Sequence, residues 1–315
     1  MRKILTAALF SACILSTSAL YAGGGGSSSG PLAGSYPIVM GHGILGFDDS
    51  QGLAFGLGQY WGGMDDYLRD EGVAVLTPGK TAAAGLEQRA RQQADQIAMW
   101  MAANGFSKVH YIGHSQGGLD GRYMISNNLC SGSYCMKNVV STYTSLNSLH
   151  DGTPIADIAL GVIPNWLEPG FATIVNFFAG LFYMDNDQDV LEMASSLSVS
   201  VANSFNANTP DAPGVKYYSY GSYMTMVDLT QHPLMSLAQP FTWAGGLAYG
   251  MGGKNDGVVP YSSQRWGTWK GGPSYGWLTT GVDHLQATNF QYTGQLFYDV
   301  EAYYLKMAKN MKNNQ

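Results

Sequence analysis

A serine flanked by glycines follows an apolar run, in a pattern that suits nucleophilic chemistry. Val109 to Ile112 is β-prone and short, as a buried strand would be. The segment Gly113-His114-Ser115-Gln116-Gly117 comes next, and Gly118 to Ile125 has a helical pattern. A serine on a tight strand-to-helix turn presents its hydroxyl clear of the sheet, beside helix N–H groups that favour negative charge. The spacing predicts that Ser115 is a nucleophile for acyl transfer.

The G-x-S-x-G pattern occurs three times in the chain, around Ser28, Ser115 and Ser274. Ser28 belongs to a low-complexity run of glycine and serine, and Ser274 lies in a glycine- and proline-rich turn with no strand-like run before it. Only Ser115 has the strand, turn and helix that the nucleophile geometry requires. The context, rather than the pentapeptide, therefore selects Ser115.

A second strand-like run, Tyr36 to Met40, leads into the glycine-rich turn from Gly41 to Gly46. Such a turn near a serine nucleophile can supply a backbone N–H to a tetrahedral oxyanion. We expect the N–H groups of Ile44 and Gln116 to do so. His42 lies in the same turn, and we interpret it as a residue that hydrogen-bonds the loop rather than as the catalytic base.

The sequence also offers an acid and a base in the required order. Enzymes with this kind of nucleophile turn place serine, acid and histidine in that order along the chain. Of the six histidines, His284 follows a candidate acid and precedes the last helical pattern. Asp256, in the turn Asn255-Asp256-Gly257, is the expected acid. Asp228 is the alternative, whereas Asp283 is a poor candidate because its side chain should point away from that of its neighbour.

The remaining patterns alternate between strand and helix. Apolar β-prone runs occupy residues 73–76, 139–144 and 215–220, and Glu87 to Asn104 is an amphipathic helix that ends at Gly105. A last helix is expected on Leu296, Val300, Tyr304 and Met307. This alternation predicts an α/β fold with a mostly parallel central sheet and helices on both faces, as one domain over residues 36–315.

The pattern changes between Ile155 and Pro213, where a helix-length run is apolar nearly all round. It is too short to span a membrane, so it is either an ordinary buried helix or a helical lid over the site. We expect a lid, because an insertion between nucleophile and acid is a common place for one. Its candidate residues are Trp166, Phe171, Ile174, Phe177, Phe178 and Leu181.

The first residues predict export. A basic start, an apolar run from Ile4 to Leu15 and a small-residue region up to Ala22 form a secretory signal peptide, cleaved after Ala22 or Ala19. A flexible glycine- and serine-rich arm is expected over residues 23–35. Cys130 and Cys135, five apart, are expected to form a disulfide in an oxidising compartment, with two free thiols as the alternative. The net charge of −6 argues against nucleic acid as a partner.

Several segments together resemble the true bacterial lipases of the Pseudomonas and Burkholderia type (family I). They are YPIVMGHGILGFDD, YWGGMDDYLRDEGVAVLTP, LEQRARQQADQI, KVHYIGHSQGG, NDGVVPYSS and DHLQATNFQ. The similarity extends from Tyr36 to about Gln291. It implies an α/β-hydrolase fold and a secreted triacylglycerol lipase with the catalytic residues named above.

Two features of that family bear on cofactors and partners. Its structural calcium is bound by an acid two residues after the catalytic histidine and a glutamine four further on, where this chain has Gln286 and Phe290. Only Asp228 remains as a ligand candidate, so structural calcium is doubtful and the chemistry requires no cofactor. Some relatives need a membrane-anchored foldase, and the sequence leaves that partner and the oligomeric state open.

Three functions follow from these residues. The first is a secreted serine ester hydrolase, a triacylglycerol lipase acting at a lipid–water interface through an acyl-enzyme on Ser115. The second is a short-chain esterase or polyester depolymerase with the same three residues and a more open site. The third is a non-catalytic, hydrolase-like surface-binding protein, which the filled catalytic positions argue against.

Overall fold

A single parallel sheet forms the centre of the computed structural model, which describes residues 29–44, 46, 59–82, 84–162 and 190–315. Its strands are arranged in the order β2-β1-β3-β6-β7-β8. They are β1 (Ile38–Gly41), β2 (Val75–Leu76), β3 (Val109–His114), β6 (Val140–Leu146), β7 (Lys216–Tyr220) and β8 (Thr268–Trp269). Every neighbouring pair is parallel, which confirms the predicted sheet and brings the carboxyl ends of the strands to one edge.

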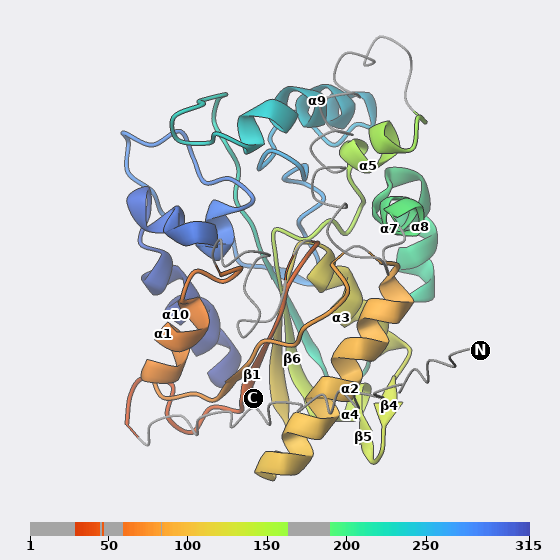
Figure 1. Cartoon of the computed structure of the whole chain (residues 1–315), viewed down its shortest axis with the longest axis vertical. Coiled ribbons are helices and arrows are strands. Elements are labelled where there is room, and N and C mark those ends of the chain that lie inside the picture. Colours follow the sequence, from red (N-terminus) through yellow and green to blue (C-terminus); the bar gives the residue numbers. More distant parts are fainter. Residues whose placement is uncertain (1–28, 45, 47–58, 83, 163–189) are drawn as a thin grey trace, which may run out of the picture.

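Helices cover both faces of the sheet, as predicted (Figure 1). Helices α1 (Met64–Asp70) and α10 (Val300–Lys312) pack on one face, and α2 (Leu86–Asn104) and α3 (Gln116–Ser126) on the other. Strand β1 contributes to the cores on both faces, because successive side chains of a strand point to opposite sides of the sheet. Ile38 and Met40 join the cluster that contains Tyr304, whereas Val39 joins the cluster that contains Ala94.

The amphipathic helix α2 lies where its periodicity predicted, one residue longer at its start. It ends at Gly105, whose φ of 70° is a left-handed conformation that glycine adopts without strain. The expected last helix was wrong at its beginning. Leu296 lies in a 3₁₀ turn (Gly294–Leu296) and is 77% exposed, and α10 begins only at Val300 because Asp299 accepts a hydrogen bond from the N–H of Ala302.

Further helices lie near the edge of the sheet that is formed by the carboxyl ends of the strands. The segment predicted as a cap contains α5 (Pro154–Ala159), α7 (Val190–Leu197) and α8 (Val199–Asn208), and α9 (Met235–Ala248) follows β7. In Figure 1, α5 and α9 lie beyond the carboxyl ends of the strands. The lid candidates from Trp166 to Leu181 lie outside the described residues, as does the predicted signal peptide.

The expected flexible arm over residues 23–35 extends too far. Leu32 is fully buried in the core, and its N–H donates to the carbonyl of Glu71. The C-terminal end of α10 adds a second contact, because Lys312 Nζ donates to the carbonyl of Pro31. The burial of Leu32, together with these hydrogen bonds, holds this segment against the domain. The glycine and serine content of residues 23–35 did not predict this contact.

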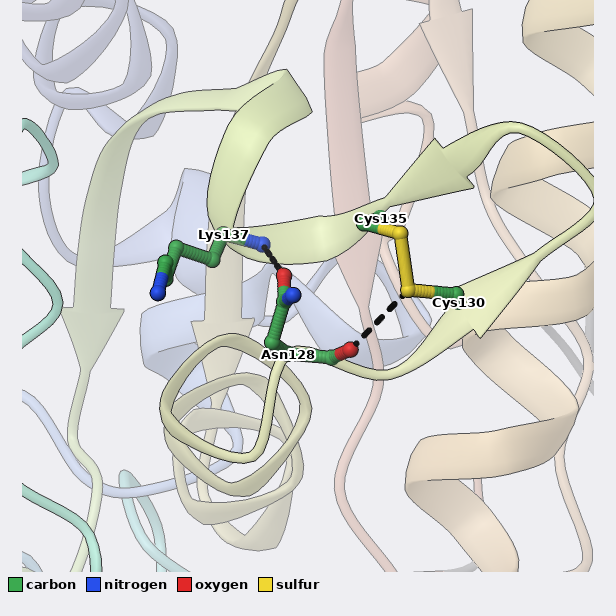
Figure 2. Close-up of a disulfide and its surroundings, with 4 residues drawn as sticks. All are labelled: Asn128, Cys130, Cys135 and Lys137. Carbon is green, nitrogen blue, oxygen red and sulfur yellow. Dashed lines mark hydrogen bonds between the residues drawn. A yellow bond between two sulfur atoms is a disulfide. The ribbon is translucent and has the colours of Figure 1, made fainter.

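The disulfide prediction is confirmed. Cys130 and Cys135 are bonded across a two-stranded antiparallel hairpin, β4 (Cys130–Ser131) and β5 (Tyr134–Cys135), which leads into the short helix α4 (Met136–Val139) (Figure 2). The Asn128 side chain accepts the N–H of Lys137 and closes the base of the loop. Figure 1 places the hairpin at the opposite end of the sheet from α5 and α9.

Candidate active site

Ser115 occupies the turn between β3 and α3 with φ 55° and ψ −131°, a strained conformation for a residue with a side chain. Two glycines allow this turn. A Cβ on Gly113 would lie 2.5 Å from the carbonyl oxygen of Gly117, and one on Gly117 would lie 2.2 Å from that of Gly41. The predicted strand-to-helix turn is therefore present. As the sequence implied, a side chain at Gly113 or Gly117 would clash with the backbone.

His284 and Asp256 are joined by two hydrogen bonds. The His284 ring and the Asp256 carboxylate meet at 2.7 Å (Nδ1 to Oδ2), and the backbone N–H of His284 donates to the carbonyl of Asp256 at 2.8 Å. The Asp256 side chain is fully buried. Its Oδ1 accepts the N–H groups of Val258 and Val259, so the carboxylate is fixed on the ring.

Two residues that were not predicted from the sequence hold this carboxylate. Asn147 Nδ2 donates to Asp256 Oδ2 at 2.7 Å, and Gln264 Nε2 donates to the same oxygen at 3.2 Å. Asn147 follows β6 directly, at the edge where the carboxyl ends of parallel strands meet, and that position was the available signal.

The alternative acids face other partners. Asp228 Oδ1 accepts the N–H and the hydroxyl of Thr230, in a local turn. Asp283 pairs with His232 at 3.0 Å, and its other oxygen accepts backbone N–H groups from the following residues. Of the three candidate acids, Asp256 is therefore the one on the His284 ring.

His284 lies against the residue that precedes the nucleophile. The rings of His114 and His284 have centroids 4.5 Å apart, and His114 Nε2 donates to the carbonyl of His284 at 3.1 Å. His114 Nδ1 accepts the hydroxyl proton of Tyr60, which in turn accepts the N–H of Gly43. One buried chain of hydrogen bonds thus joins the turn after β1, the residue before Ser115 and the loop that carries His284. These contacts were not predicted from the sequence.

The candidate oxyanion donors lie on the two segments that flank Ser115. A Cβ on Gly43 would lie 2.7 Å from the Cβ of Ser115, so the turn after β1 packs directly on the nucleophile, and Ile44 is the next residue. Gln116 is the first residue of α3, where backbone N–H groups have no partner within the helix. The Gln116 side chain donates to the carbonyl of Ala84 and fixes this end of the helix.

His42 is bound into its loop at both ring nitrogens. Its Nδ1–H donates to the carbonyl of Gly43 at 2.7 Å, and its Nε2 accepts the N–H of Lys80 at 3.1 Å. Burial, with Lys80 and Arg89 close by, holds its pKa well below the usual value. A buried ring with both nitrogens engaged cannot act as a general base, which agrees with the interpretation from sequence.

The third G-x-S-x-G serine has a different environment. Ser274 lines a pocket of about 370 Å³ together with tyrosines that include Tyr223 and Tyr261. Neither Ser115 nor His284 is among the residues that line it. Strand β8 ends at Trp269, five residues before Ser274, and residues 270–274 form neither a turn nor a helix, so Ser274 lacks the strand-to-helix turn of Ser115.

The residues at the family's calcium positions do not fit a calcium site. A phenylalanine, Phe290, has no ligating atom, and Gln286 Oε1 already accepts the backbone N–H of Asp283 at 3.0 Å. The Gln286 amide donates to the carbonyl of Gln231 at 2.7 Å, so it ties the histidine loop to the 228–236 segment by hydrogen bonds. Within the described ranges, no group of three or more His, Cys, Asp or Glu side chains is placed to hold a metal ion.

Four buried histidines predict acid sensitivity. Burial lowers the pKa of His42, His114 and His150 well below the usual value and that of His110 to about 4. The unfolded chain binds these protons near its ordinary pKa of about 6.5, whereas the folded chain excludes them. The free energy of unfolding should therefore fall as pH drops below about 6.5, with a slope approaching about 1.4 kcal/mol per pH unit for each histidine.

Urea unfolding between about pH 7.5 and 5 measures this slope, which corresponds to the uptake of about four protons on unfolding. The variant His110→Gln removes one of the four groups and should reduce the uptake by about one proton. A free energy of unfolding that stays constant from pH 7 to 5 would contradict the prediction.

Comparisons with known proteins agree with the topology. A lipase of Staphylococcus hyicus has a similar structure, with a TM-score of 0.61 and 18% identity over 88% of this chain and 95% of that one. The chain has an α/β-hydrolase fold. No protein-family model matches this chain.

Two of the curated relatives illustrate the similarity in sequence. The triacylglycerol lipase of Vibrio cholerae is 28% identical over 225 residues, which are 64% of this chain and 67% of that protein. The triacylglycerol lipase of Burkholderia plantarii is 29% identical over 56% of this chain, and the match spans about half (49%) of its length. Among the described residues, no helix is both long and apolar enough to span a bilayer.

Proposed function

We propose that the protein is a serine carboxylic-ester hydrolase, a triacylglycerol lipase that forms an acyl-enzyme on Ser115. The observation that carries the proposal is the hydrogen-bonded pair of His284 and Asp256 lying against the turn that bears Ser115. The relatives support a hydrolase of the lipase or esterase kind, since those similar in sequence are triacylglycerol lipases and the similar structures include a lipase and a carboxyl esterase.

The chemistry follows from the positions of the three residues. Ser115 Oγ attacks the ester carbonyl carbon while His284 Nε2 takes its proton. Asp256 holds the imidazole with Nδ1–H toward the carboxylate and stabilises the imidazolium. The N–H groups of Ile44 and Gln116 receive the oxyanion, and the leaving alcohol takes the proton from His284. A water molecule then attacks the acyl carbonyl and gives its proton to His284. His284 passes the proton to Ser115 Oγ as the acid leaves, so the reaction requires no cofactor.

Export is part of the proposal. The basic and apolar leader and the disulfide between Cys130 and Cys135 support a secreted protein, because such bonds persist in oxidising compartments. The substrate would then be an external lipid or another external ester.

Initial rates on three substrates test the assignment: a tributyrin emulsion, dissolved p-nitrophenyl esters of increasing chain length, and a polyester film. A lipase with a lid should hydrolyse tributyrin, with a rate that rises once the substrate passes its solubility limit. Saturation below that limit would favour the short-chain esterase, and release of products from the film would favour the depolymerase. Absence of turnover on all three would refute an ester hydrolase.

A further inference from the structure

A buried guanidinium lies directly behind the turn that carries the candidate oxyanion donor Ile44. Arg89, on α2, is fully buried, and all five of its N–H donors have acceptors. Nε donates to Asp120 at 3.0 Å, and Nη1 donates to the carbonyls of Thr81 and Ala82. Nη2 donates to the carbonyls of His42 at 2.9 Å and Gly43 at 3.0 Å.

The carbonyl of Gly43 belongs to the same peptide group as the N–H of Ile44. It accepts two hydrogen bonds, one from Arg89 Nη2 and one from His42 Nδ1 at 2.7 Å. A peptide group is planar and trans, so its N–H points away from its C=O. Fixing the carbonyl on Arg89 and His42 therefore fixes the direction of the Ile44 N–H on the opposite side.

The preceding peptide group is held at both ends as well. The carbonyl of His42 accepts from Arg89, and the N–H of Gly43 donates to the hydroxyl of Tyr60 at 2.8 Å. Gly43 has no side chain that could lock this turn by packing, and a Cβ there would lie 2.7 Å from the Cβ of Ser115. The hydrogen bonds supply the rigidity that a glycine turn lacks.

Charge at this place favours the same result. Arg89 and Lys80 both contact Asp120 Oδ2, at 3.0 Å and 2.9 Å, and the side chains of all three are fully buried. A cation that donates to a carbonyl polarises the whole amide, so the N–H on its other side becomes a stronger donor. An oxyanion at Ile44 would benefit from that polarisation without any reorganisation.

We infer that Arg89 and His42 are positioning residues that clamp the Gly43–Ile44 peptide and so aim and strengthen the oxyanion donor of Ile44. The inference rests on the proposed function, because it concerns the same ester-hydrolysis site. Neither residue touches substrate. Both act through the peptide group, and their effect should therefore appear in the transition state rather than in substrate binding.

The variant Arg89→Met tests the clamp and leaves Asp120 paired with Lys80. We expect kcat to fall at least about tenfold, toward the hundredfold or more of a lost oxyanion donor, while KM changes little. A trifluoromethyl ketone, which adds to Ser115 as an oxyanion, should lose affinity in parallel with kcat/KM. Arg91→Met is the matched control, because Arg91 lies on the exposed side of α2 with Glu87, and it should keep wild-type values for all three.

A second pair of variants decides the case if Arg89→Met does not fold. His42→Phe removes the donor to Gly43 and should lower kcat and ketone affinity together, whereas His42→Gln can replace the donor and should retain more of both. Folded variants with wild-type kcat, or with losses confined to KM, would overturn the clamp. Ester turnover that is absent in the wild type would instead refute the proposed function, and this inference with it.

Discussion

The variant Ser115→Ala is expected to lose ester turnover by on the order of 10⁵-fold or more, because no other hydroxyl occupies the β3–α3 turn. The reason is covalent: without Oγ the acyl-enzyme cannot form, and only the oxyanion donors and substrate binding remain. Rates of p-nitrophenyl ester hydrolysis under saturating substrate measure the loss. The substitution is small and should leave the unfolding transition close to that of the wild type.

Ser274→Ala is the matched control for the nucleophile, since Ser274 also stands at the centre of a G-x-S-x-G sequence. Ser274 is exposed and lines a different pocket, so we expect its replacement to leave kcat within about twofold. Full turnover by Ser115→Ala would refute the assignment of the nucleophile, and equal losses in the two variants would show that neither serine acts specifically.

The variant Asp256→Asn should lower kcat by about 10⁴-fold. Asparagine can present an N–H to His284 Nδ1, and the imidazole would then adopt the tautomer in which Nε2 cannot accept the serine proton. The measurement is kcat as a function of pH, combined with an unfolding curve. That curve is needed because Asn147 and Gln264 both donate to the Asp256 carboxylate, and an amide nitrogen in its place would face their N–H groups.

Asp228→Asn serves as the control for the acid, because the sequence left Asp228 as the alternative. Asp228 accepts from the N–H and hydroxyl of Thr230, in a turn of its own. We expect its kcat to remain near that of the wild type. A larger loss in Asp228→Asn than in Asp256→Asn would reverse the assignment of the acid.

Local patterns predicted the strands β1, β2, β3, β6 and β7 and the helices α2 and α3, whereas α9 and β8 were not predicted. The runs around Val109 and Val140 are apolar and β-prone, and the stripe Ala90, Ala94, Ile97 and Met101 repeats at helical spacing, so each segment prefers one secondary structure. Where a local cap or contact decides, the prediction failed. The hydrogen bond that Asp299 accepts places the start of the last helix at Val300 rather than at Leu296. The burial of Leu32 means that the flexible arm does not extend to residue 35.

The order of residues along the chain was enough to predict the candidate serine, acid and histidine. A serine turn on a parallel sheet leaves few places for the acid and the histidine. Which groups hold them could not be predicted. Asn147 and Gln264 meet on Asp256 from segments 117 residues apart (264 − 147), and Arg89 reaches the Gly43 carbonyl from 46 residues along the chain. Such contacts depend on how helices pack on the sheet, which no local pattern specifies.

Ser115 illustrates the division most clearly. The sequence by itself predicted a tight turn at Ser115, because a β-prone run ends just before Gly113 and a helical pattern begins just after Gly117. Only the tertiary structure decided that Asp256 rather than Asp228 contacts His284, and that Arg89 and His42 hold the turn opposite Ser115. The physical reason is that turn conformation is a property of neighbouring residues, whereas a buried hydrogen bond requires partners that meet only after the chain has folded.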